Sequence, residues 1–318
     1  MWQLRQPGPA TFERHQVAAP SDADVGPDQV LLRFLAGSIC GSDIPKFLGQ
    51  TDPTSPSTGE PGVPLHEFVG RVEASRSDRF APGDRVVGNI AGACGLAELV
   101  VNPAPYVHPV DERLTDVGAT VVQPLATVLN ALSNVSDVAG RTVAVLGLGP
   151  IGLLFTQVLK ARGAAWVIGV DRVDRSDVAR AFGIDEVATA DVRTWAAAPT
   201  GSTRPSLVVD AIGHGQQHVA DAVDALAYGG ELLVFGLPDE HYVFPMLTFY
   251  RKALRMWSGA TRDWSRFLAD AHEHVLRHDV LTEAYVTHTM SVFDAQEAYR
   301  VYATPAVGRL KVALTVPG

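Results

Sequence analysis

The feature that most constrains this chain is a glycine-rich segment, Gly-Leu-Gly-Pro-Ile-Gly at 147–152, placed directly between two apolar runs. The first glycine permits a tight turn, the second lets the backbone approach a pyrophosphate, and the third allows a helix to pack closely on a strand. The amides and the positive dipole end of the helix that follows favour an anion. The segment therefore predicts a strand–turn–helix unit that binds a dinucleotide through Gly147, Gly149, Pro150, Ile151 and Gly152.

An acidic residue at the end of the next strand supports this interpretation. The apolar run 166–170 is followed by Asp171, about twenty residues beyond the glycines, where an acid that bonds the ribose belongs. Such an acid would repel a 2′-phosphate, so the sequence favours NAD over NADP. Arg172 follows at once and would either stack on the adenine or hold that phosphate, which keeps NADP open. The alternative is a glycine-rich packing turn with an ordinary surface aspartate.

Strands and helices alternate around this motif, whereas the first 110 residues show short strands and turns with no helical period. Alternation predicts a parallel sheet with crossover helices, a doubly wound α/β domain. The N-terminal pattern predicts a partly open β-barrel. A Pro/Ser/Thr/Gly-rich loop spans 50–64. We expect strands at 30–35, 69–72, 84–87, 142–146, 166–170, 207–210 and 231–235, and helices at 124–132, 151–161, 175–182, 219–227 and 264–276.

Composition excludes several other classes of protein. The 318 residues are 47% hydrophobic, which is ample for packed cores, and the net charge of −9 disfavours a nucleic-acid partner. The longest apolar stretch, 142–159, is broken by glycines and a proline, so we expect no membrane span. The N-terminus has no apolar signal-peptide core, and two cysteines cannot build a disulfide framework, so the predicted compartment is the cytoplasm.

Three short motifs precede the glycine segment: Cys-Gly-Ser-Asp at 40–43, His-Glu-Phe-Val-Gly at 66–70 and Gly-Asp-Arg-Val at 83–86. With matching segments at 123–126, 209–213, 229–232, 257–259 and 308–312, they resemble the medium-chain dehydrogenase/reductase superfamily. Within it, the resemblance is to zinc-dependent alcohol and polyol dehydrogenases of the sorbitol type. It implies a GroES-like, partly open β-barrel catalytic domain at 1–123 and 262–318. It also implies a doubly wound Rossmann domain at 124–261.

The resemblance implies one catalytic zinc per chain. Cys40 and His66 supply the thiolate and imidazole that zinc prefers. Glu67 resembles the glutamate that completes the metal shell, and its alternative role is a structural salt bridge. Gln123 stands where relatives usually carry glutamate, aspartate or cysteine; a neutral amide is a poor zinc ligand, so we expect it to bond a metal-bound water or the substrate. No structural zinc is expected, because Cys94 is alone where many relatives have four cysteines.

The expected catalytic residues are Ser42, Asp43 and Glu67. Ser42 resembles the hydroxyl that takes the alcohol proton and passes it outward. Relatives often continue this relay with a histidine, but Pro45 stands in that region here. Asp43 is expected to accept the spare N–H of His66 and so fix its tautomer, or else to cap a turn.

The remaining cofactor contacts are also implied by the resemblance. Lys311 resembles a basic residue that reaches the pyrophosphate, with a solvated surface lysine as the alternative. Gly213 is expected at the cofactor as well. Phe235, Gly236 and Leu237 end a strand where the family's backbone groups meet the nicotinamide.

These expectations together predict an enzyme that transfers a hydride between NAD(H) and a secondary alcohol or ketone of the polyol, sugar or cyclitol-like kind. One alternative is a zinc-independent, NADPH-dependent reductase of the quinone or enoyl type. The other is a catalytically silent dinucleotide-binding protein. Family members are usually dimers or tetramers that pair Rossmann sheets edge to edge, so the resemblance implies a homodimer or homotetramer joined through 246–257.

Overall fold

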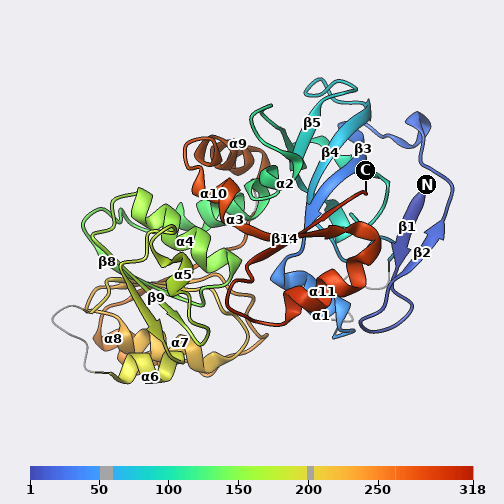
Figure 1. Ribbon diagram of the computed structural model, residues 1–318. Coiled ribbons are helices and arrows are strands. Elements are labelled where there is room, and N and C mark those ends of the chain that lie inside the picture. The colour runs from blue at the N-terminus through green and yellow to red at the C-terminus, as the bar shows by residue number, and fades with distance from the viewer. Residues whose placement is uncertain (51–59, 199–203, 262, 318) are drawn as a thin grey trace. The chain divides into compact units, whose positions relative to one another are not determined.

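A computed structural model describes all residues except 51–59, 199–203, 262 and 318 (Figure 1). Most of the loop predicted at 50–64 therefore lies outside the described residues. The chain forms two compact units. The first consists of Met1–Ala126, Asp263–Pro305 and Arg309–Gly318, and the second of Thr127–Arg262 with Ala306–Gly308.

The first unit is built on a seven-stranded sheet whose neighbouring strands are antiparallel except for one parallel pair, β14 with β15. A separate hairpin joins β1 (Trp2–Arg5) and β2 (Glu13–Gln16). The strands of the large sheet, in spatial order, are β14 (Val286–Ser291), β15 (Lys311–Thr315), β3 (Gln29–Ser38), β4 (Glu67–Ser75), β5 (Arg85–Asn89) and β7 (Val107–Pro109), with β6 (Leu99–Pro103) pairing β3.

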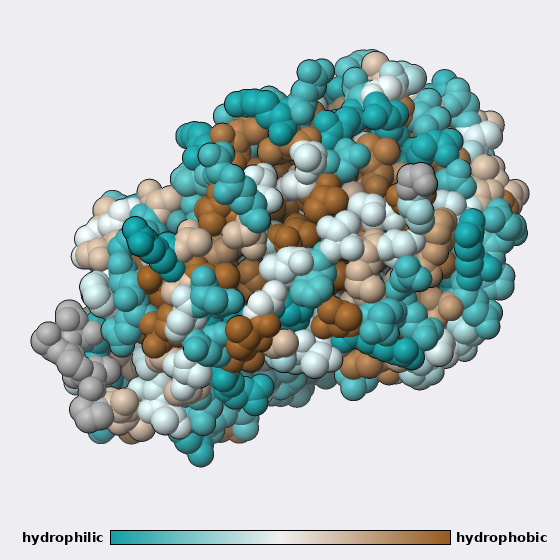
Figure 2. Space-filling view, viewed as in Figure 1, coloured by the Kyte–Doolittle hydropathy of each residue, from teal (hydrophilic) through white to brown (hydrophobic). Residues whose placement is uncertain are grey.

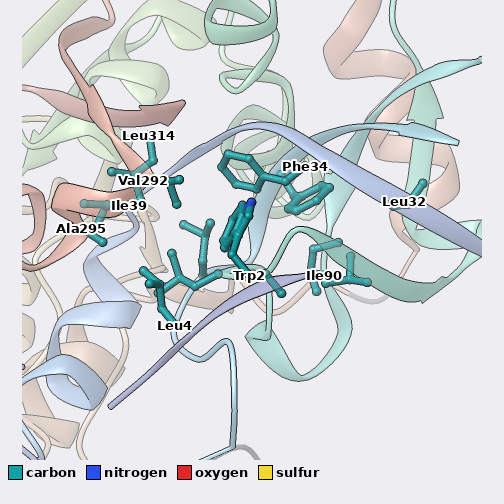
Figure 3. Packing of buried hydrophobic residues seen from close by; sticks show 14 of the residues in the cluster. Trp2, Leu4, Leu32, Phe34, Ile39, Ile90, Val292, Ala295 and Leu314 are labelled. Atoms are coloured by element: carbon teal, nitrogen blue, oxygen red, sulfur yellow. The ribbon is translucent and has the colours of Figure 1, made fainter. Parts of the chain in front are cut away.

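The longest strand, β3, contributes alternate side chains to the hydrophobic core of this unit. Val30, Leu32 and Phe34 alternate along it, and all three are buried in one cluster. Trp2 packs its ring edge-to-face against Phe34, with centroids 5.6 Å apart (Figure 3). The helices of the unit are short apart from α9 and α11: α1 (Ile44–Phe47), α2 (Asp116–Ala119), α9 (Trp264–Val275), α10 (Val280–Glu283) and α11 (Ala295–Ala303).

The second unit contains a six-stranded sheet in which every neighbouring pair is parallel. Its order is β10 (Glu186–Thr189), β9 (Trp166–Asp171), β8 (Thr142–Leu146), β11 (Leu207–Asp210), β12 (Glu231–Val234) and β13 (Arg255–Ser258). The helices are α4 (Pro150–Ala161), α5 (Ser176–Ala179), α6 (Val192–Ala197), α7 (Gln216–Ala225) and α8 (Met246–Arg251). A further helix, α3 (Val122–Leu132), crosses the boundary between the two units in sequence.

The predicted fold class, a partly open β-barrel unit with a doubly wound parallel sheet, is confirmed. The helix expected at 175–182 is shorter, because only Ser176–Ala179 is helical and a turn follows. The short elements β10 and α6 were not expected.

The surface mixes polar and apolar residues. On the face seen in Figure 2, hydrophilic and hydrophobic residues are interspersed. Within the described parts of the chain, no helix combines the length and the apolar character that crossing a membrane requires.

Candidate active site

A group of donor atoms forms in the first unit where β3 ends and the chain turns. Cys40 precedes a 3₁₀ turn at Gly41–Asp43, and its thiol is half-buried. The Asp43 carboxylate accepts the N–H of Cys40 through Oδ2 at 3.0 Å, which holds the turn closed. Ser42 is exposed, and its hydroxyl donates to Cys40 Sγ at 3.3 Å. The turn therefore places a thiol and a solvent-accessible hydroxyl side by side.

His66 stands immediately before β4, and the same carboxylate fixes its ring. His66 Nδ1 lies 2.8 Å from Asp43 Oδ1. Burial disfavours the charged ring, but the charge and hydrogen bond of Asp43, helped by Cys40, outweigh burial and raise the pKa of His66 well above its usual value. With Nδ1 engaged, Nε2 is the nitrogen left for a metal, which binds the neutral ring and so displaces a proton.

Glu67, the first residue of β4, is fully buried and carries an ion pair. It lies opposite Ser38 in the sheet, and the Ser38 hydroxyl donates to Glu67 Oε2. The ammonium of Lys311, on the far side of β3, lies 2.6 Å from both carboxylate oxygens. Neither charged side chain has exposed surface. Three adjacent strands thus fix the position of this carboxylate.

The donor atoms of Cys40, His66 and Glu67 all lie within 4.8 Å of one another. In the part of the chain that the structure describes, no other cluster of three or more histidine, cysteine or acidic side chains is close enough to hold a metal ion. A thiolate, an imidazole whose other nitrogen is bonded to a carboxylate, and a carboxylate form a donor set that suits zinc. The residues therefore fit the metal that the sequence implies.

Gln123 lies near this group but makes a different contact. It is buried on α3, and its amide donates a 3.4 Å hydrogen bond to Asn89 Oδ1. Asn89 ends β5 and lies opposite Glu67 in the sheet. Gln123 thus reaches the strand beside Glu67, and its role toward a metal-bound water or the substrate stays a prediction.

The structure does not support either role expected for Lys311. A solvated surface lysine would be exposed, but Lys311 is fully buried. A lysine that reaches a pyrophosphate needs a free ammonium, whereas this one is paired with Glu67. The ion pair expected as the alternative role of Glu67 is present, and Lys311 is its partner. Residue spacing could not reveal this, since the pairing depends on strand register.

In the second unit, the glycine segment forms a tight turn between β8 and α4. Gly147 has a φ of +86°, which favours glycine. A Cβ on Gly152 would lie 1.8 Å from the carbonyl oxygen of Gly147, so only glycine fits at this close approach. Gly149 caps the helix without a side-chain bond, and Pro150 follows at the first turn, with Ile151 after it. A Cβ on Gly149 would meet no atom within 4 Å. The space beside Gly149 is therefore open, as the approach of a pyrophosphate would require.

Asp171, the last residue of β9, lies at the same turn. Its Oδ2 accepts the N–H of Leu148 at 2.6 Å and its Oδ1 accepts that of Val173 at 2.8 Å. Each oxygen retains acceptor capacity for a ribose hydroxyl. Arg172 is exposed beside it.

The turns after β11 and β12 touch each other through glycines. A Cβ on Gly236 would lie 2.0 Å from the amide nitrogen of Gly213, which has a φ of +71°. Leu237 O accepts the N–H of His214 at 2.8 Å, and Leu237 itself is exposed. Phe235 packs on Phe155 of α4, with centroids 5.0 Å apart. Because β8, β9, β11 and β12 are parallel, the expected cofactor residues that follow them lie together at the carboxyl ends of these strands.

Sequence reasoning missed Ser38 and Asn89, both beside Glu67. A serine or an asparagine at the end of a strand carries no motif signal. Only the cross-strand register, Ser38 with Glu67 and Glu67 with Asn89, identifies them.

Comparison with known families gives two matches. The profile of the family described as alcohol dehydrogenase GroES-like domain matches residues 26–112. The profile of the family described as zinc-binding dehydrogenase matches residues 150–273.

Individual proteins agree with these matches. L-threonine 3-dehydrogenase of Anaeromyxobacter dehalogenans is 26% identical over 335 residues, covering 93% of each chain. Sorbitol dehydrogenase of Bombyx mori is 28% identical over 260 residues, covering 70% of this chain and 74% of the relative. A crystal structure from Escherichia coli, described as a short chain alcohol dehydrogenase complexed with NADH, superposes with a TM-score of 0.86. It is 22% identical and covers 99% of both chains.

Proposed function

This chain belongs to the zinc-binding, medium-chain alcohol dehydrogenase family, and we propose that it transfers a hydride between a secondary alcohol or ketone and NAD(H). The observation that carries the proposal is the donor group of Cys40, His66 and Glu67, whose donor atoms lie within 4.8 Å of one another. The first unit would hold the metal and the substrate oxygen, and the second would hold the dinucleotide.

The donor group and its neighbours divide three tasks: metal binding, orientation of the histidine ring and proton transfer. Cys40, His66 and Glu67 would hold one zinc, while Asp43 keeps the His66 ring oriented through Nδ1. When bound, the zinc supplies a Lewis acid for the substrate oxygen and the dinucleotide supplies the hydride acceptor. Ser42 would accept the hydroxyl proton of the alcohol as it donates its own proton to water, which its exposure allows.

NAD is the proposed dinucleotide. The Asp171 carboxylate, fixed by two backbone hydrogen bonds, would repel a 2′-phosphate. The Escherichia coli neighbour complexed with NADH supports this choice. A neighbour from Sinorhizobium meliloti is bound to NADP, and exposed Arg172 is the residue through which this chain would accept that cofactor instead.

The proposed substrate is a polyol, a sugar or a cyclitol-like secondary alcohol. Support comes from relatives named sorbitol dehydrogenase and D-arabinitol dehydrogenase, which are 28% and 27% identical.

Metal content and NAD-linked turnover of the purified protein test the proposal together. We expect about one zinc per chain by plasma mass spectrometry, in keeping with the one three-residue donor group found among the described residues. In Cys40→Ser the zinc and the turnover of a polyol panel should be lost while NAD still binds. Full activity in Cys40→Ser would contradict the zinc role. A wild-type protein without zinc after incubation with the metal, and with NADPH-linked reduction, would favour the metal-free reductase.

We also propose that the chain works as a homodimer or homotetramer in the cytoplasm. The edge strand β13 has a partner on one side only within the described sheet, and apolar residues are exposed on it and on α8, namely Met246, Leu247, Tyr250 and Met256. A second copy of this chain can cover such an edge by symmetric pairing. The unpaired state of both cysteines supports a reducing compartment.

A further inference from the structure

The ion pair between Glu67 and Lys311 is built into three neighbouring strands. Ala313 of β15 lies opposite Ser38 of β3, and Ser38 lies opposite Glu67 of β4. Lys311 shares a face of β15 with Ala313, because side chains alternate along a strand. The ammonium bonds both carboxylate oxygens at 2.6 Å, and the Ser38 hydroxyl bonds one of them. Sheet register, rather than the reach of a flexible lysine, therefore holds the carboxylate.

Two tyrosines surround the ammonium. The ring centroid of Tyr302 lies 5.8 Å from Lys311 Nζ, within cation–π range. Tyr285 is fully buried, and its hydroxyl has no hydrogen-bond partner among the described residues. Burial raises the pKa of both hydroxyls, so both stay neutral beside the pair. The surroundings are apolar enough to strengthen the attraction between ammonium and carboxylate.

Stability alone does not account for such a pair. Removing each ion from water costs several kcal/mol, and well-packed apolar residues in place of a buried pair are often as stable or more so. This carboxylate, however, also lies within 4.8 Å of the donor atoms of Cys40 and His66. What the pair adds is a buried carboxylate that points in a fixed direction beside two other metal donors.

We propose that Lys311 and Ser38 are positioning residues that hold the Glu67 carboxylate in place as the third protein ligand of the metal. The inference rests on the proposed zinc site. Neither residue touches the metal, and each acts through Glu67. Removal of side chains that hold a metal ligand typically lowers metal affinity by about 10- to 100-fold.

An opposing effect has to be weighed, since the ammonium also competes with a metal for the carboxylate. A carboxylate has about four acceptor positions on its two oxygens. Lys311 uses one on each oxygen and Ser38 uses a second on Oε2, which leaves one on Oε1 for a metal. A metal and the two positioning groups can therefore contact the carboxylate at the same time.

Zinc affinity, measured by competition with a chromophoric chelator, tests the proposal. Lys311→Met keeps an unbranched side chain, one atom shorter, and removes its charge, and we expect zinc affinity to fall by about 10- to 100-fold. Glu67→Gln removes the ligand itself, and adding Lys311→Met to Glu67→Gln should lower zinc affinity no further, because Lys311 acts only through Glu67. The absorption bands of the cobalt-substituted protein should change in the same variants. Unchanged or tighter zinc binding in Lys311→Met would overturn the proposal, as would a further loss of zinc affinity when Lys311→Met is added to Glu67→Gln.

Ser38→Ala tests the same idea without unpairing a charge, so it serves even where Lys311→Met does not fold. We expect a several-fold loss of zinc affinity with the fold intact, and unchanged affinity would count against the proposal. Lys160→Met is the matched control, since Lys160 pairs with Asp185 at 2.8 Å at the surface of the second unit. Its zinc affinity should equal that of the wild type. A wild-type protein without zinc would instead refute the proposed function.

Discussion

Gly152 has room for no side chain, because the carbonyl oxygen of Gly147 occupies the place of its Cβ. In Gly152→Ala the helix α4 must move away from the turn, and overpacking of this kind costs about 1–3 kcal/mol. We expect the free energy of unfolding, measured by urea denaturation, to fall by that amount. A variant as stable as the wild type would mean that the turn relaxes freely.

Gly149 provides the matched comparison three residues earlier. Its φ is −69° and a Cβ there would meet no atom, so Gly149→Ala should keep its stability within about 0.5 kcal/mol. The added methyl group would stand where the pyrophosphate approaches the helix. Calorimetric titration should show weaker NAD binding in Gly149→Ala. Equal NAD affinity would contradict the role assigned to this turn.

Asp43 and Ser42 are neighbours with separable tasks. Asp43→Ala removes the partner of His66 Nδ1 and of the Cys40 amide, and we expect zinc affinity to fall by about 10- to 100-fold. Ser42→Ala should keep its zinc and lose turnover by about 10²- to 10⁴-fold, because the proton acceptor is gone. Equal zinc loss in both variants would show that the turn, rather than the carboxylate, determines binding.

The sequence predicts which residues form the site better than it predicts which residues they contact. The motifs identify Cys40, His66 and Glu67, and the structure brings their donor atoms together. Lys311 lies 244 positions after Glu67, and nothing local in the sequence states that β15 and β4 both flank β3. A buried salt bridge across a sheet depends on strand order, which short motifs do not encode.

At the scale of elements, apolar strands and long helices were predicted well. The central strands β8, β9, β11 and β12 are apolar runs bounded by turns, and each lies where it was expected. The edge strand β10 and the short helix α6 were missed. β10 is a four-residue edge strand without a buried residue, so it carries no apolar run.

The packing of α9 on β7 should make stability depend on pH. His108 of β7 lies with its ring 5.1 Å from that of His272, whose Nε2 accepts the N–H of Asp111 at 3.0 Å. Burial, with the charges of His272 and Arg79, lowers the pKa of His108 to about 4. In the unfolded chain His108 binds a proton near pH 6.5, whereas in the folded protein it does so only near pH 4. The neutral ring therefore contributes fully to stability above pH 6.5, and this contribution is lost as the pH falls from 6.5 to 4.

Urea denaturation at pH 7.5 and pH 5 measures this contribution. After allowance for partial exposure we expect about 1–2 kcal/mol less stability at pH 5 from His108, and His108→Gln should remove that part of the difference. His241→Gln is the control, since His241 is 88% exposed. An unchanged pH profile in His108→Gln would refute the assignment.

For the whole molecule, the testable feature is the free edge of the parallel sheet. If a second copy covers β13 and α8, the double substitution Leu247→Glu/Met256→Lys should convert an oligomer into monomers with unchanged circular dichroism. Light scattering during size exclusion gives the mass directly. Val307→Glu, at an exposed apolar position on neither element, should leave the oligomer intact. A wild-type protein with the mass of one chain would end this proposal.

The first unit is assembled from both ends of the chain, and this affects how it can fold during synthesis on the ribosome. Its sheet takes β3 and β4 from the first hundred residues but receives β15, which lies between β14 and β3, from the last ten. The second unit is nearly continuous in the chain and is fully translated before β15 exists. The strand that carries Ser38 must therefore wait, without its partner β15, until translation ends. A chain released before Lys311 would hold a buried carboxylate with no counter-charge, so early termination should yield a protein with an intact parallel sheet and a defective metal site.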